Sequence, residues 1–408
     1  MLVLEAVVSF RSVPRILALF NLKTPLELAW IPHFTSVINW NLRVGLGLLC
    51  QVCPICEPWV AIIDHSIDIG TKKALVVLRV KMDILSQRNG AIQLQDCECI
   101  GLKVCETANS ATVCKDLTEI FAISGVPNAI VKDCDVTLAK GVRDWSEQQQ
   151  KSVPVIDDIG HSMANALKKQ FEKTAAYKAF TALVSQGAKC LRQTEFAFLT
   201  PPKLRTKGRF QSISKLGEWG AKMLNVFAVK GCAKKGSVLA KLRHAFPNFL
   251  QMKAFIERFA QTAKIVSEVM DILKNKGLNK ATYKQCYELS KMLPRNSQVK
   301  KRLQAWLKKH LKIQQETTEL PLLVSSDIIE SLFGNYKHII ERSPQADMNR
   351  SVLLIPALCG SRKEVVIHQA LKNASQVDLE KWEKENIPYT IRKKRQEFFE
   401  NQSQKQGK

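Results

Sequence analysis

The chain has 408 residues, of which 46% are hydrophobic, so it is long enough to form two or three globular domains. It carries 61 Lys and Arg residues against 37 Asp and Glu residues, and the formal net charge of +24 favours a polyanionic partner such as nucleic acid, although charge alone also fits a basic ribosomal or membrane-surface protein. No run of 18 apolar residues occurs, so we expect no membrane span, and the charges of Glu5, Arg11 and Arg15 within the apolar start argue against a secretory signal.

The first 57 residues are predicted to be helical. One helix opens at residues 8–13 with Ser9 as its N-cap, and a second begins near Pro32 and continues to about residue 46. Two short helices joined by a polar turn fit a helix-turn-helix DNA reader, and a plain helical bundle cap fits equally well. On the first interpretation, the second helix presents its DNA-binding residues on its outer face: Thr35, Ser36, Asn39 and Arg43.

A cysteine cluster follows this helical region. Cys50, Cys53 and Cys56 have the spacing of a structural zinc site. The second half of such a site is Cys97 and Cys99, in an apparent strand whose side chains alternate between faces. We therefore favour incidental cysteines over zinc, and the scatter of the twelve cysteines fits a reducing cytoplasm.

Between residues 58 and 158 the apolar pattern becomes that of buried strands alternating with helices. This pattern predicts a mixed α/β sheet. The expected strands span residues 59–64, 74–80, 98–106, 128–131 and 152–156, and the expected helices span residues 111–123 and 136–145.

From residue 159 to about 320 almost the whole chain is predicted to be helical. A basic loop after Pro201 and Pro202 interrupts this region, and an amphipathic helix at 325–341 follows it, with Ser325 or Ser326 as its cap and Lys337 in its last turns. The basic loop contributes four candidate DNA-binding residues: Lys203, Arg205, Lys207 and Arg209. The main helices expected within the region span residues 164–185, 249–274, 280–292 and 298–312.

Three acidic residues stand out by their positions in these elements. Asp64 and Asp133 each close an apolar, β-branched run, and Glu330 lies within the predicted helix 325–341. Acids at strand ends and on a helix face can converge on one pocket, where hard oxygen ligands hold Mg²⁺ beside a phosphate. Each acid taken alone fits an ion pair or a helix cap as well.

The segments around these acids together resemble the catalytic segments of bacterial insertion-sequence DDE transposases with an RNase H-like core. Residues 64–78, 126–142 and 328–337 are similar to the first, second and third segments, and the resemblance covers about 7–375. The resemblance implies an all-helical domain inserted in the core, and the spacing agrees with it, because Glu330 lies 197 residues after Asp133 whereas Asp133 lies only 69 after Asp64. The implied parts are a helix-turn-helix-like region (1–57), the first part of the core (58–189), the insertion (190–322), the last part of the core (323–375) and a basic tail (376–408).

The resemblance also implies roles for single residues. The three catalytic residues would be Asp64, Asp133 and Glu330, which would hold two Mg²⁺ or Mn²⁺ ions. However, Lys132 and Cys134 stand where the family usually has serine and glycine. Asp135 therefore remains an alternative to Asp133. Asp158 and His161 match an auxiliary Asp-x-x-His signature, in which His161 contacts a phosphate or orients an acid, against the alternative of a plain helix N-terminal histidine. Trp219 resembles a tryptophan that stacks on a flipped DNA base, against the alternative of a core residue. Lys337 completes the candidate DNA contacts.

The function that the resemblance implies is transposition: metal-dependent cleavage of DNA at insertion-sequence ends, followed by joining to a target. The expected partners are double-stranded DNA with terminal inverted repeats and further copies of the chain, as a homodimer or higher oligomer at the nucleoid of the bacterial cytoplasm. Two alternatives remain open. One is a truncated, inactive DNA-binding remnant, because the region before the predicted helix-turn-helix is short, and the other is an RNase H-like nuclease without a joining step.

Overall fold

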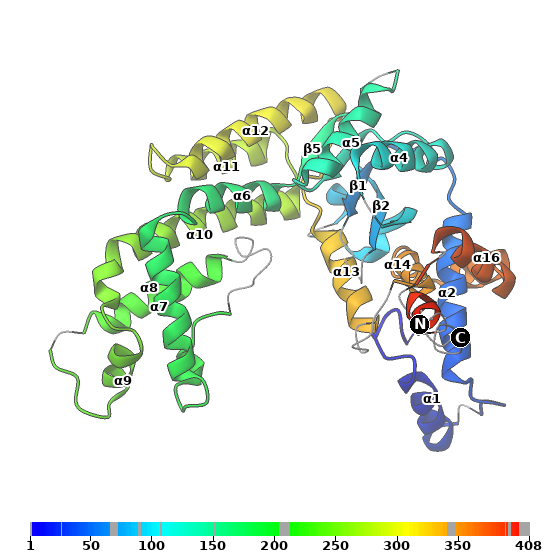
Figure 1. Ribbon diagram of the computed structural model, residues 1–408. Helices are drawn as coiled ribbons and strands as arrows, with labels where there is room; N and C mark the ends of the chain where they lie inside the picture. Colours follow the sequence, from blue (N-terminus) through cyan, green and yellow to red (C-terminus); the bar gives the residue numbers. More distant parts are fainter. Residues whose placement is uncertain are drawn as a thin grey trace, which may run out of the picture. The chain divides into compact units, whose positions relative to one another are not determined.

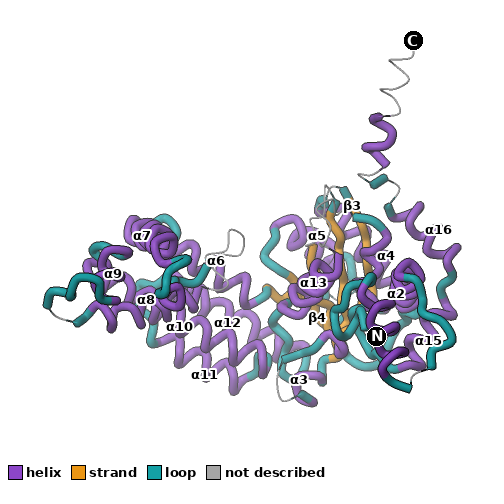
Figure 2. The backbone as a smooth tube through the Cα atoms, turned by 90° about the horizontal axis from the view of Figure 1, so that it is seen from below, coloured by secondary structure: helices purple, strands orange, loops and turns teal. Residues whose placement is uncertain are grey.

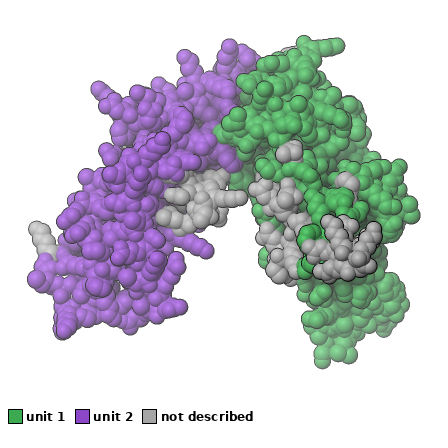
Figure 3. Space-filling view, in the orientation of Figure 1, with its two compact units in different colours: residues 1–156, 325–408 green, residues 157–324 purple. Residues whose placement is uncertain are grey.

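The fold is described from a computed structural model of the chain. The chain forms two compact units, Met1–Ile156 with Ser325–Lys408 (unit 1) and Asp157–Val324 (unit 2), each coloured separately in Figure 3. No helix among the described residues is long and apolar enough to span a bilayer. The described residues are 2–25, 27–65, 72–88, 91–106, 108–150, 152–203, 213–229, 231–340, 348–387, 389–390 and 393–399.

Unit 1 is built on a five-stranded mixed sheet with the strand order β3-β2-β1-β4-β5. The central strand β1 pairs antiparallel with β2 and parallel with β4, and β2 pairs antiparallel with β3. This is the RNase H-like mixed sheet that the sequence predicts, and all five expected strands are confirmed. The strands are β1 (Trp59–His65), β2 (Lys73–Lys81), β3 (Cys97–Cys105), β4 (Ala129–Lys132) and β5 (Val155–Asp157).

Helices cover both faces of this sheet (Figures 1 and 2). On one face, α4 (Ser110–Ser124) and α5 (Val136–Glu147) pack Phe121 and Trp145 against Ala61, Ile63 and Ile130 of the strands. Side chains alternate along a strand, so every second residue of β1 and β4 points to the opposite face. There, α13 (Asp327–Ile340) contacts β1, and α2 (Phe34–Cys50) and α14 (Leu354–Ala357) contact β3.

The N-terminal helices belong to unit 1, which corrects the prediction of a separate region at 1–57. After α1 (Ser12–Lys23), α2 is one continuous helix that packs against α14 and α15 (Glu364–Asn373) and also against α16 (Gln376–Asn386), which lies in the predicted tail. A Cβ atom at Gly45 would lie 1.7 Å from the carbonyl oxygen of Leu353, and one at Gly47 would lie 1.9 Å from that of Ala370. Such close approach holds α2 against the C-terminal segment (Figure 1).

Unit 2 is all-helical among its described residues, as predicted, but it begins at Asp157 rather than at residue 190. The earlier start follows from packing, because α6 contacts both α10 and α12. The single helix expected at 164–185 is two helices, since Thr174 caps α7 by accepting a 3.3 Å hydrogen bond from the backbone N–H of Tyr177. The helices are α6 (Ile159–Phe171), α7 (Ala175–Leu191), α8 (Ile213–Phe227), α9 (Val238–Ala245), α10 (Lys253–Lys276), α11 (Lys280–Lys291) and α12 (Gln298–Thr317).

Short helical segments connect the longer elements of both units or extend their ends. They are α3 (Ile84–Gln87) and the 3-10 helices Leu94–Asp96, Ala197–Leu199, Phe249–Met252 and Arg350–Leu353.

Candidate functional site

Two of the three predicted acids lie on neighbouring parallel strands. Ile63 of β1 is paired with Lys132, the last residue of β4; Asp64 follows Ile63 within β1, and Asp133 directly follows the end of β4. Ala61, Ile63 and Ile130 belong to the core under α4 and α5. By alternation, Asp64 and Asp133 therefore point to the other face, which is the face that α13 covers.

The environment of Asp133 distinguishes it from Asp135. Asp64 is buried, with 6% of its surface exposed, and Asp133 is half-buried. Oδ1 of Asp133 accepts a 2.9 Å hydrogen bond from the backbone N–H of Asp135, which orients the carboxylate. The carboxylate of Asp135 instead caps α5, because its Oδ1 accepts a 2.9 Å hydrogen bond from the backbone N–H of Leu138.

Glu330 lies in the first turn of α13, on an exposed position of a helix that contacts β1. Ser325, one of the two predicted caps, accepts at Oγ a 3.2 Å hydrogen bond from the N–H of Asp327, the first residue of α13. The buried stripe of α13, which includes Ile329 and Phe333, fixes which side of the helix faces the sheet. Lys337 is half-buried near the other end.

The donor chemistry of these acids suits Mg²⁺, which prefers oxygen ligands. However, no group of three or more His, Cys, Asp or Glu side chains in the described ranges is arranged to hold a metal ion. The fold thus brings Asp64, Asp133 and the helix of Glu330 to one face of unit 1, but their three carboxylates do not form an assembled metal site.

His65 ends β1 directly beside Asp64. By alternation it points toward the α4 and α5 face rather than toward α13. Burial lowers the pKa of His65 to about 4, and the negative charge of Asp135 opposes this shift only in part. The imidazole is therefore neutral at pH 7.

Asp158 and His161 lie in unit 2, where they form a helix cap. Asp158 is fully buried, and its Oδ1 accepts a 2.6 Å hydrogen bond from the backbone N–H of His161 at the start of α6. The same oxygen lies 3.0 Å from Nδ1 of His161. These contacts give the pair a structural role, and its auxiliary role at a phosphate stays a prediction.

The predicted DNA-reading face of α2 is partly occupied by contacts within unit 1. Thr35 is exposed, and Ser36 and Asn39 are half-buried. Arg43 was expected on the outer face, but its guanidinium donates 2.7 Å hydrogen bonds to the carbonyl oxygens of Leu371 and Ala374 at the end of α15. Arg43 therefore caps a helix C-terminus, where a cation is favourable.

The predicted basic loop is described only in part. Lys203 is exposed. Arg205, Lys207 and Arg209 lie outside the described residues, so their DNA-binding role stays a prediction.

Trp219 of α8 is half-buried in an aromatic cluster of unit 2. Its indole ring lies 5.3 Å from the ring of Phe246 and 5.9 Å from that of Phe249, measured between centroids. Its Nε1–H donates a 3.0 Å hydrogen bond to the carbonyl oxygen of Leu199. These contacts favour the core alternative over stacking on a flipped base.

The cysteines form no zinc site among the described residues. Cys50, Cys53 and Cys56 are exposed, whereas Cys97 and Cys99 are buried. Burial raises the pKa of both buried thiols to about 12, so they are protonated at neutral pH. The interpretation of these cysteines as incidental stays a prediction.

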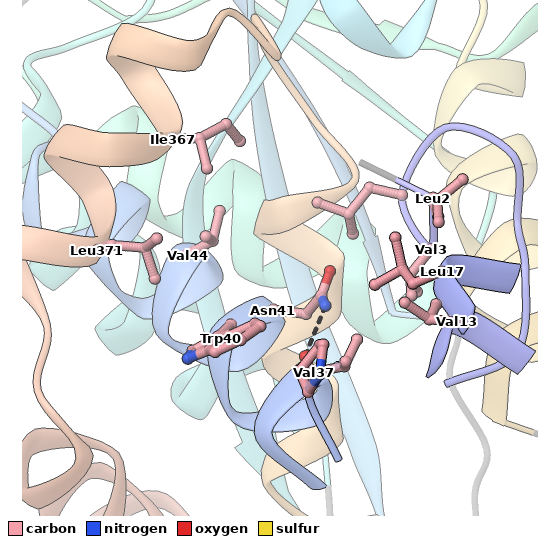
Figure 4. Close-up of a pocket in the computed structure, with 12 residues that line it drawn as sticks. Leu2, Val3, Val13, Leu17, Val37, Trp40, Asn41, Val44, Ile367 and Leu371 are labelled. Atoms are coloured by element: carbon pink, nitrogen blue, oxygen red, sulfur yellow. Dashed lines mark hydrogen bonds between the residues drawn. The ribbon is translucent and has the colours of Figure 1, made fainter. Parts of the chain in front are cut away.

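A cavity of about 310 Å³ in unit 1 lies apart from the acids, because none of them lines it. It lies between α1, α2 and α15, with mostly apolar walls such as Leu17, Val37 and Leu371 (Figure 4). Its one amide, Asn41, donates a 2.7 Å hydrogen bond to the carbonyl oxygen of Val37 on its own helix. Such a lining does not suit a phosphate.

The net charge is divided very unevenly between the two units, a feature that the total of +24 conceals. Unit 2 holds 32 of the 61 Lys and Arg residues but only 11 of the 37 Asp and Glu residues. Its formal charge is therefore +21, and unit 1 carries only +3 of the total of +24. Counting charge segment by segment would have shown this without a structure.

The chain was compared with protein-family profiles, curated proteins and solved structures. No protein-family profile matches the chain, and no curated protein matches its sequence. Among solved structures, the chain is similar to the Drosophila P element transposase strand transfer complex, with 11% identity and a TM-score of 0.41. That match covers 85% of this chain and 96% of the transposase chain. A likeness this weak adds nothing to the site described above.

Proposed function

We propose that the chain is a DDE-type DNA transposase whose catalytic residues are Asp64, Asp133 and Glu330. The observation that supports this most is the register of β1 and β4, which sets two acids on the sheet face that α13 covers. The sequence resemblance implies acids at two strand ends and on a helix, and the positions of these three residues in the chain support the proposal. Bound divalent metal would supply charge neutralisation at the phosphate and a more acidic water or 3′-hydroxyl nucleophile.

The protein's own contribution would be positioning. The backbone N–H of Asp135 orients the Asp133 carboxylate, and the buried position of Asp64 fixes its side chain at the strand end. Fixed groups lower the barrier of an in-line displacement at phosphorus because little reorganisation remains during the reaction. Neither cleavage nor joining needs a covalent intermediate with the protein.

The partners proposed with this function are double-stranded DNA with terminal inverted repeats and at least one further copy of the chain. We propose the bacterial cytoplasm, at the nucleoid, as the place where they meet. The high positive charge of unit 2 supports a polyanionic partner.

The alternative of an inactive DNA-binding remnant has one observation in its favour. No group of three acidic, histidine or cysteine side chains in the described part of the chain is arranged to hold a metal ion. A remnant would bind the same DNA through its basic unit but would not cut it.

Cleavage and joining of labelled DNA separate these functions. The substrate is a duplex that carries the DNA flanking the coding sequence, incubated with the full chain and Mg²⁺ or Mn²⁺. A transposase cleaves this duplex and joins it to a second DNA, and Glu330→Gln abolishes both steps. Asp327→Asn is the matched control, because Asp327 is an acid in the same turn of α13.

Each outcome has one interpretation. Cleavage without joining favours the RNase H-like nuclease, and binding without cleavage favours the remnant. Equal activity of Glu330→Gln and the wild-type chain rules out the proposed catalytic set.

A further inference from the structure

The positive charge of unit 2 is most concentrated on the hairpin formed by α11 and α12. Residues 280–317 contain ten Lys and Arg residues but only two acidic residues, Glu288 and Glu316. This segment therefore carries a formal charge of +8 over two helices that pack on each other. Its buried residues, such as Leu303 and Leu307, face the rest of unit 2 and leave the opposite side to solvent.

Three lysines form a straight stripe on the exposed side of α12: Lys301, Lys308 and Lys312. Their spacing of seven and then four residues sets them within about 40° around the helix axis, at intervals of about 10 and 6 Å. Lys301 and Lys308 have no ion-pair partner among the described residues, and Lys312 lies 3.7 Å from Glu316. We call these three residues the α12 stripe.

The neighbouring helix repeats the pattern. Lys280, Lys284 and Lys291 of α11 are exposed and follow one another at four and seven residues, which again places them on one side. Lys291 pairs with Glu288 at 2.7 Å, and Arg295 adds an exposed cation in the connection between the helices. Each of the two contacting helices therefore carries a row of exposed cations.

The long helix α10 shows that such rows are not a general property of unit 2. Lys253 and Lys264 are exposed on α10, but each lies 3.8 Å from a glutamate one turn later, Glu257 and Glu268. Alternating signs of this kind give a solvated face with little net potential. The hairpin has fewer compensating acids: Glu288 and Glu316 each pair with one lysine, and ten Lys and Arg residues face only these two acids.

We propose that the exposed side of the α11–α12 hairpin binds the phosphate backbone of duplex DNA without reading its sequence. Rows of flexible, singly charged ammonium groups attract phosphates at many relative positions, but they do not contact base edges in a fixed geometry. The proposal rests on the proposed function only for its choice of DNA as the polyanion. Its residues are different from the three acids and from the DNA contacts predicted from the sequence.

The test is the salt dependence of binding to a random-sequence duplex, measured by fluorescence anisotropy with the full chain in EDTA. The variant Lys301→Gln/Lys308→Gln/Lys312→Gln removes the α12 stripe. The control Lys253→Gln/Lys264→Gln/Lys276→Gln removes the same charge from exposed positions of α10. Thermal unfolding of both variants checks that each remains folded.

The stripe variant should bind about ten-fold or more weakly at 0.1 M salt. The plot of log K against log salt should also become less steep, by about 0.9 for each phosphate contact that is lost. The control should keep the wild-type slope. Equal losses in the two variants, or no loss in the stripe variant, would overturn the proposal. Tighter binding of an RNA duplex through the same lysines would overturn the assignment to DNA.

This experiment can fail separately from the proposed function. EDTA removes any metal-dependent cleavage, and the duplex carries no element end. The cleavage result for Glu330→Gln does not affect the interpretation of the binding experiment. An unchanged salt dependence in the stripe variant likewise does not affect the interpretation of the cleavage experiment.

Discussion

The backbone N–H of Asp135 donates a 2.9 Å hydrogen bond to Oδ1 of Asp133. The two acids therefore have different roles. Asp133 directly follows β4 and is oriented by the backbone of the next turn, while Asp135 caps α5. The sequence left these residues as alternatives for the second catalytic acid. Their different contacts lead to opposite expectations on mutation.

Asp133→Asn should abolish cleavage with little change in stability, because the amide oxygen can still accept the Asp135 hydrogen bond but the charge is lost. Asp135→Ala should retain cleavage and lower the free energy of unfolding by about 1 kcal/mol, the usual cost of losing an N-cap. Cleavage assays and urea unfolding of both variants measure the difference. Full activity in Asp133→Asn together with inactivity in Asp135→Ala would reverse the assignment.

The two glycines of α2 should tolerate no side chain. Gly45→Ala and Gly47→Ala place a Cβ atom within 2 Å of a backbone carbonyl oxygen of the C-terminal segment, so each should destabilise the chain by about 3 kcal/mol or more. Gly334→Ala is the control, because nothing lies within 4 Å of the new Cβ in α13.

The control should raise stability by up to about 1 kcal/mol, since alanine is a better helix former than glycine. Denaturant unfolding of the three variants checks the set. Wild-type stability of Gly45→Ala and Gly47→Ala would show that α2 is not packed into unit 1 as described.

Trp219 should act through packing. Trp219→Ala removes the ring contacts with Phe246 and Phe249 and the hydrogen bond to Leu199, so we expect a loss of about 3 kcal/mol in stability. Trp219→Phe restores much of the ring and should recover most of that loss and near wild-type DNA processing. Wild-type stability of Trp219→Ala combined with loss of DNA processing would favour base stacking instead.

The cysteines should divide into two classes by reactivity. At pH 8, Cys53 and Cys56 should react with iodoacetamide within minutes because they are exposed. Cys97 and Cys99, with pKa values raised to about 12 by burial, should react only after unfolding, since about one thiol in ten thousand is ionised. Mass spectrometry of the alkylated chain gives the order. Protection of Cys53 and Cys56 that a chelator removes would indicate the zinc site.

Local patterns predicted the sheet and the helices of unit 1 well. The apolar runs of β1, β2 and β4 are buried on both faces, and such runs are recognisable without knowing their partners. The strand-end positions of Asp64 and Asp133 follow from the same runs. The capping roles of Asp135 and Ser325 need only neighbours within three residues.

Long-range packing could not be predicted from local sequence patterns. The hydrogen bonds of Arg43 join residues more than 300 positions apart, and the close approach at Gly45 and Gly47 depends on the same distant segment. The boundary of unit 2 was also misplaced, because α6 and α7 have the same helical pattern whether they pack on the sheet or on α10 and α12. Only the tertiary contacts decide between these arrangements.

The proposed function requires Asp64, Asp133 and Glu330 to bind divalent metal together, although their carboxylates are not assembled into a metal site in the structure. Anomalous diffraction from crystals of the full chain grown with Mn²⁺ and a DNA duplex tests this requirement most directly. We expect manganese peaks bridged by the Asp64 and Asp133 carboxylates, with Glu330 within about 2.5 Å of one of them, and no peak in crystals of Asp64→Asn. Manganese bound elsewhere, or DNA bound with these carboxylates apart and metal-free, would contradict the claim.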